Sequence, residues 1–111
     1  MKKSTSILLG SIVAIGLFSS TASADIKKGQ KIYLKKCKKC HGNGTKGAAM
    51  HTQAEWSDLF DADAAKIIEA HKGSKAEKYF NGKKFIGKYA PHLKDFLHEY
   101  GNDSGNVPSC G

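Results

Sequence analysis

The pentapeptide Cys37-Lys38-Lys39-Cys40-His41 constrains this chain more than any other part of its sequence. Two thiols three residues apart on one helical turn project from the same face, so both can bond to the vinyl groups along one edge of a porphyrin. The imidazole of His41, which follows at once, can then reach the iron. The pattern predicts one covalently attached haem c, with Cys37 and Cys40 as its anchors and His41 as an axial ligand of the iron.

Two other interpretations of the cysteine pair fit the sequence less well. A structural zinc site takes four ligands, commonly from two such pairs, but the third cysteine is Cys110, near the end of the chain. A redox-active dithiol of the thioredoxin kind lies in a strand-helix-strand unit, whereas residues 32–36 are lysine-rich and have a helical pattern. In an oxidising compartment Cys110 is an unpaired thiol, either incidental or available for intermolecular pairing.

Residues 1–24 have the pattern of a secretory signal peptide. Lys2 and Lys3 precede an apolar stretch over residues 7–18, and Ala22-Ser23-Ala24 forms a small-residue cleavage site. The apolar stretch is short for a membrane span and has no stop-transfer flank. We therefore expect export to the periplasm, cleavage after Ala24, and a single cytochrome-sized domain over residues 25–111 without a stable membrane span.

The charge of the chain comes from lysine alone. The formal net charge is +8, and loss of Lys2 and Lys3 with the expected signal peptide lowers it to +6. Arginine, the residue best suited to bidentate contacts with phosphates and base edges, is absent from the sequence. The composition therefore predicts no nucleic-acid partner, and it favours a monomer that meets redox proteins through their acidic docking surfaces.

Apolar residues recur at helical spacing and no segment alternates with period two, which predicts an all-α fold. We expect loops at residues 42–47 and 81–90 and an irregular tail from residue 102. The expected helices cover residues 26–39, with Gly29 allowing close approach of another helix; 53–60, opened by a capping box of Thr52 and Glu55; 61–71, capped by Asp61 or Asp63 and ended by Gly73; 76–80; and 91–100, with Pro91 in the first turn.

The run from Lys28 to His41 resembles the N-terminal helix and haem motif of the small class I cytochromes c, including the glycine at Gly29 and the aromatic Tyr33. The apolar run that begins at Leu93 resembles the C-terminal helix of that family, which crosses the first helix at the glycine. The resemblance implies a small helical fold wrapped around one haem, in which Gly29 and Tyr33 meet Leu93 and Phe96. It also implies transfer of single electrons between respiratory partners.

One feature departs from that family. Its second axial ligand is usually a methionine just before the last helix, and residues 72–92 contain none. His71 shares an apolar helical face with Ile67 and Ile68, in a segment that resembles the family helix packed on the distal face of the haem. His71 is therefore our expected second ligand, and the alternatives are His92, the pair Met50 and His51, His98, and an open position.

No acid–base pair, activated nucleophile or second metal constellation is visible in the sequence, so we expect an electron carrier and no enzyme. Two alternatives remain open. The first is a haem sensor or small-ligand-binding protein with a vacant sixth position. The second is a haem subunit held permanently in a larger redox complex.

Overall fold

The computed structural model describes residues 21–109, and side chains from residue 26 onward. Every regular element in this range is helical, which confirms the predicted all-α fold. None of these helices combines the length and the apolar character needed to cross a bilayer. Residues 1–20 of the expected signal peptide (residues 1–24) lie outside the described residues, as does Cys110, and the first helix begins at Thr21, earlier than expected. The elements are α1 (Thr21–Lys36), α2 (Lys38–His41), α3 (Gly44–Ala48), α4 (Gln53–Leu59), α5 (Asp61–Ala70), α6 (Glu77–Asn81), the π-helix η1 (Phe85–Tyr89) and α7 (Ala90–Glu99).

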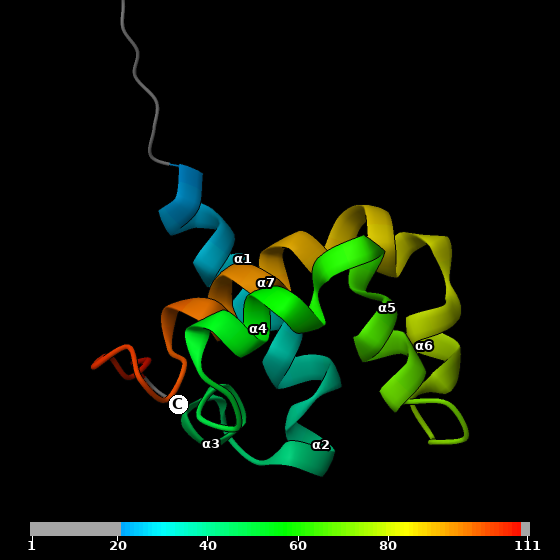
Figure 1. Ribbon diagram of the computed structural model, residues 1–111, viewed down its shortest axis with the longest axis horizontal. Coiled ribbons are helices and arrows are strands. Elements are labelled where there is room, and N and C mark those ends of the chain that lie inside the picture. The colour runs from blue at the N-terminus through cyan, green and yellow to red at the C-terminus, as the bar shows by residue number, and fades with distance from the viewer. Residues whose placement is uncertain (1–20, 110–111) are drawn as a thin grey trace, which may run out of the picture.

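The first and last helices form the most extensive helix–helix contact, and α1 passes behind α7 in Figure 1. The absence of a side chain at Gly29 permits this crossing. A Cβ there would lie 2.7 Å from Cβ of Phe96, and closer still to the main-chain oxygen of His92. One turn later the ring of Tyr33 packs on Phe96, with centroids 5.7 Å apart. The contacts of Gly29 and Tyr33 with Phe96 confirm the expected crossing.

Gly29→Ala should therefore destabilise the protein, although alanine is the better helix former by about 1 kcal/mol. The new methyl group must push apart two helix backbones, and overpacking of this kind costs about 1–3 kcal/mol. For a domain of this size the melting temperature should fall by about 4–8 °C per kcal/mol. Gly87→Ala in η1 is the matched control, because a Cβ there meets nothing within 4 Å. Equal melting temperatures for the two variants would contradict the packing argument.

The residues after the haem motif form helix α3, where a loop was predicted. Its N-cap is Asn43, whose side chain accepts a hydrogen bond of 2.9 Å from the main-chain N–H of Lys46. A side chain at Gly47 would collide with the phenol of Tyr33, and the Tyr33 hydroxyl donates to the carbonyl of Gly42 at 2.7 Å. The glycines that suggested a loop thus allow a short helix to pack against α1.

The capping box at the start of α4 is present as predicted. The Thr52 side chain accepts a hydrogen bond from the backbone N–H of Glu55, and the Glu55 side chain accepts one from the backbone N–H of Thr52. The prediction that Asp61 or Asp63 caps the next helix is wrong. Helix α5 follows α4 after Phe60 alone, without a side-chain cap, and residues 62–64 turn the chain with φ of 52–61°. The helix ends at Ala70, earlier than expected, and Gly73 with φ of +80° lies in the following turn.

The second predicted loop is also helical. Helix α6 lies close to the expected position, but residues 85–89 then form a π-helix that runs directly into α7. Its wide turn is closed by a hydrogen bond from the Ala90 N–H to the carbonyl of Phe85. Phe85 is 1% exposed, so burial of this ring outweighs the loop tendency of the neighbouring lysines and glycines. Pro91 lies in the first turn of α7 as predicted.

Candidate cofactor site

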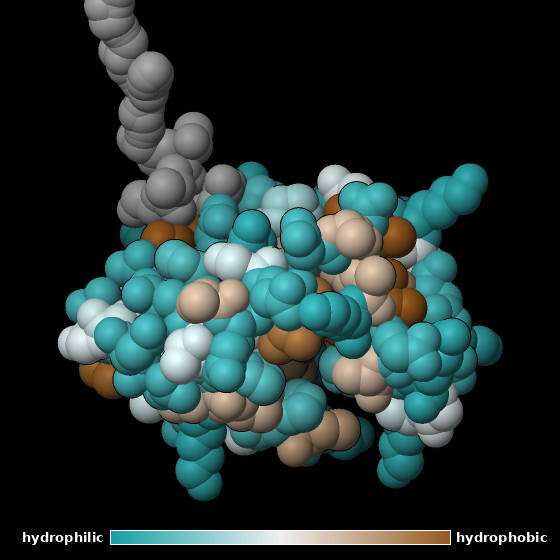
Figure 2. All heavy atoms as spheres, viewed as in Figure 1, coloured by the Kyte–Doolittle hydropathy of each residue, from teal (hydrophilic) through white to brown (hydrophobic). Residues whose placement is uncertain are grey.

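A cavity of about 470 Å³ opens between the haem-motif segment and helices α4, α5 and α6. This volume is within the range of about 300–1,000 Å³ that is typical of small-molecule and cofactor sites. Figure 2 shows apolar surface at the centre of this face, surrounded by hydrophilic residues. The lining is mainly apolar and comprises Tyr33, Lys36, Cys37, Cys40, His41, Met50, His51, Trp56, Leu59, Phe60, Ile67, Ala70, His71, Ser74, Lys75, Ala76, Phe80, Leu93 and Leu97.

The two cysteines and His41 all line this cavity. The sequence predicted one continuous helix up to the haem motif, but the structure has two helices separated by a break. Helix α1 ends at Lys36, and Cys37 forms a break before the single turn of α2. The Cys37 carbonyl accepts hydrogen bonds from the N–H groups of Cys40 and His41 at 3.2 and 3.0 Å. This turn brings all three side chains to one wall.

Both thiols of the motif are free, and they differ in environment. Cys37 is 9% exposed, whereas Cys40 is exposed. Burial, together with the neighbouring Cys40, raises the pKa of Cys37 to about 12. Cys37 is therefore a neutral thiol in an apolar wall at neutral pH, and Cys40 stands at the opening of the cavity.

His71 faces His41 inside the cavity. Their ring centroids are 6.1 Å apart and the planes are nearly perpendicular, at 83°. The pKa of His41 is lowered, first by burial and then by the proximity of His71. These two imidazoles lie 30 residues apart in the sequence, and the fold brings them together as the distal-ligand hypothesis requires.

Two contacts orient the His71 ring. Its Nδ1 lies 2.7 Å from the carbonyl oxygen of Ile67. A carbonyl only accepts, so Nδ1 carries the hydrogen and Nε2 of the neutral ring keeps its lone pair. The ring also stacks on Phe80, with centroids 4.1 Å apart and an interplanar angle of 25°. Such support from a backbone carbonyl is typical of histidines that bind metals through the other nitrogen.

The donor set fits a haem between the two imidazoles. His41 and His71 would each hold the haem iron through a ring nitrogen, because their imidazoles lie across the cavity from one another with centroids 6.1 Å apart. Cys37 and Cys40 on the same wall as His41, and an apolar lining, complete the chemistry that covalent haem attachment needs.

The alternative ligands separate into two groups. Met50 and His51 line the cavity, whereas His92 and His98 are not among its lining residues. Met50 is 43% exposed, so it is not part of the core. The ring of His51 packs edge-on against Trp56 at 4.7 Å, and its Nδ1 lies 3.6 Å from a carboxylate oxygen of Glu55.

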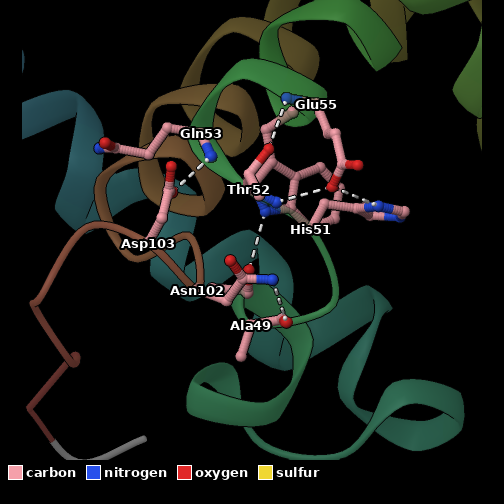
Figure 3. Close-up of polar contacts among 9 residues, drawn as sticks. Ala49, His51, Thr52, Gln53, Glu55, Asn102 and Asp103 are labelled. Carbon is pink, nitrogen blue, oxygen red and sulfur yellow. Dashed lines mark hydrogen bonds and ion pairs between the residues drawn. The ribbon is translucent and has the colours of Figure 1, made fainter.

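The segment around His51 is hydrogen-bonded to residues that follow α7, as Figure 3 shows. The backbone N–H of Asn102 donates to the His51 carbonyl at 3.0 Å, and its side chain donates to the Ala49 carbonyl at 3.3 Å. The N–H of Gln53 donates to the carboxylate of Asp103 at 2.8 Å. The residues just after α7 thus hold this wall of the cavity in place.

Sequence reasoning missed the residues that support His71 and surround it. Phe80 was assigned to a short helix without a role, yet it forms the stack beneath the His71 ring. Ser74 and Lys75 add polar groups to the lining. The turn signal Gly73-Ser74 was the available clue, because a chain reversal there returns α6 toward the end of α5.

The family model that matches residues 24–96 is described as cytochrome c oxidase, cbb3-type, subunit III. The chain belongs to this family of cytochrome c domains. The assignment confirms the resemblance to small c-type cytochromes and implies covalently bound haem c and haem-based electron transfer. No significant match to a curated protein or to a solved structure accompanies it.

Proposed function

We propose that the protein is a periplasmic single-electron carrier with one haem c, attached through Cys37 and Cys40 and held between His41 and His71. The observation that carries this proposal is the facing pair of imidazoles, 6.1 Å apart in a cavity that both cysteines also line. A bound haem supplies a one-electron iron couple, which is the chemistry that the family assignment implies.

Each part of the chain has a distinct task in this proposal. The cysteines fix the cofactor covalently, and the Ile67 carbonyl and Phe80 keep the His71 ring oriented for the iron. The apolar lining limits access of water, which influences the reduction potential. The signal-peptide pattern supports export, and the excess of lysine supports partners with acidic docking surfaces.

The family description favours a second candidate, a haem subunit that stays within a larger redox complex. The same haem site serves both functions, because each requires reversible one-electron exchange. They differ in whether the mature protein is recovered free from a periplasmic extract or together with membrane components, which fractionation of the native host distinguishes.

Spectroscopy of the purified holoprotein tests the electron-carrier proposal. Two imidazole ligands should give low-spin iron in both oxidation states, no sulfur-to-iron charge-transfer band, and no reaction of the ferrous form with CO. A sulfur band would assign the second position to Met50. A high-spin ferrous form that binds CO would contradict the carrier and support a sensor with an open position.

A further inference from the structure

The helical turn that carries the haem motif has few contacts of its own that could fix its position. Helix α2 has four residues, none of them buried, and no side chain caps its N-terminus. Helices this short are not stable by themselves in water. The side chains of the motif must nevertheless reach three points of one cofactor, and a working site holds such groups within about 0.5 Å. The turn therefore needs support from another element.

Tyr33 in α1 is hydrogen-bonded to both ends of the haem motif. Its main-chain carbonyl accepts from the N–H of Cys37 at 2.8 Å, and its hydroxyl donates to the carbonyl of Gly42 at 2.7 Å. Gly42 follows His41 directly and has φ of 85°, and its N–H donates to the carbonyl of Lys38 at 2.9 Å. The peptides on both sides of Gly42 are thus fixed, and with them the main chain that carries the His41 imidazole.

The position of the Tyr33 phenol is itself fixed by other helices. Tyr33 is 1% exposed, and its ring packs on Phe96 of α7 with centroids 5.7 Å apart. Its hydroxyl lies so close to α3 that a side chain at Gly47 would collide with it. Burial, and then the neighbouring Cys37, raises the pKa of Tyr33 to about 12, so the hydroxyl keeps its proton at neutral pH and remains a donor. The ring thus connects α1, α3 and α7 with the haem motif.

We propose that the Tyr33 hydroxyl is a positioning group for the cofactor site. Its hydrogen bond to Gly42 holds the turn of the haem motif, and thereby sets the orientation in which the His41 imidazole meets the iron. This inference rests on the proposed function, in which His41 is an axial ligand. Phenylalanine at position 33 would keep the ring that packs on Phe96 and lose the hydrogen bond alone. The consequence of that loss is a changed orientation of His41 on the iron.

The test compares the oxidised holoproteins of Tyr33→Phe and Tyr100→Phe by proton NMR and electron paramagnetic resonance. The resonance positions of the haem methyl groups and the g values of low-spin iron depend on the orientation of the axial imidazoles. Tyr100→Phe is the matched control, because Tyr100 packs on the same Phe96 ring at 5.4 Å and is not among the residues that line the cavity. Tyr33→Phe should shift the haem methyl resonances and the g values. The control should leave both at their wild-type positions.

Unshifted resonances and g values in Tyr33→Phe, even with a lower melting temperature, would show that the phenol only fills space and would overturn the proposal. Equal shifts in the two variants would also overturn it. If Tyr33→Phe yields no holoprotein, the diamagnetic ferrous form of the wild-type protein decides instead. Its Tyr33 hydroxyl proton must then exchange slowly and show a nuclear Overhauser effect to Gly42, and absence of this signal would refute the hydrogen bond. Wild-type iron without a histidine ligand would instead refute the proposed function itself.

Discussion

Serine at both Cys37 and Cys40 should produce a chain from which acidified organic solvent extracts all haem and which is degraded after export. The buried core of a domain this small is limited, and a cavity of about 470 Å³ lies where the cofactor is expected to bind. Without covalent attachment the stabilisation by bound haem depends on free haem concentration. Haem staining after denaturing electrophoresis and immunoblotting of the periplasmic fraction measure both effects.

The single variants Cys37→Ser and Cys40→Ser are the controls for this experiment. Each keeps one thiol in the cavity wall, so haem should remain with the chain through denaturing electrophoresis. We expect lower yield for Cys37→Ser than for Cys40→Ser, because Cys37 is buried in the core and Cys40 is exposed. Haem that stays with the double variant under denaturing conditions would refute attachment through this pair.

Alanine at His71 should convert the low-spin iron to a high-spin form or to one that binds an added ligand such as CO. The substitution removes the imidazole that faces His41 and leaves a gap beside Phe80. His71→Met should raise the reduction potential where the thioether reaches the iron, since methionine ligation raises the potential of cytochrome haem. Visible and electron paramagnetic resonance spectra, with a redox titration, measure these changes.

Parallel substitutions at the other candidate positions make the His71 experiment selective. His92→Ala should leave the spin state unchanged, because His92 is not among the residues that line the cavity. Met50→Ala should also leave it unchanged, although Met50 does line the cavity. A native low-spin spectrum in His71→Ala, together with its loss in one of these two variants, would assign the distal position elsewhere.

The parts of the fold that the sequence predicted are those set by local chemistry. The capping box of Thr52 and Glu55 needs only residues three positions apart. The glycine at position 29 predicted close approach of another helix, and the resemblance to the class I cytochromes c implied that this partner is the last helix. Ile67 and His71, which the helical spacing assigned to one face, both line the cavity.

The parts that were wrong depend on contacts between distant residues. Residues 44–48 are helical because Gly47 fits against the phenol of Tyr33, which no local pattern in that segment indicates. The π-helix buries the Phe85 side chain in the core and leads directly into α7, and both requirements depend on residues outside the segment. The stack of His71 on Phe80 likewise depends on how α6 returns to α5.

The hydrogen bonds of Asn102 and Asp103 with the segment around His51 have a consequence for the order in which the domain can be completed. A chain is synthesised from its N-terminus, so the cysteines of the haem motif emerge well before residue 102 does. Until then α7 cannot cross α1, and the wall that carries Met50 has no anchor. The thiols are thus accessible on an incompletely folded domain, and residues 102 and 103 complete the cavity wall after the cysteines can already react.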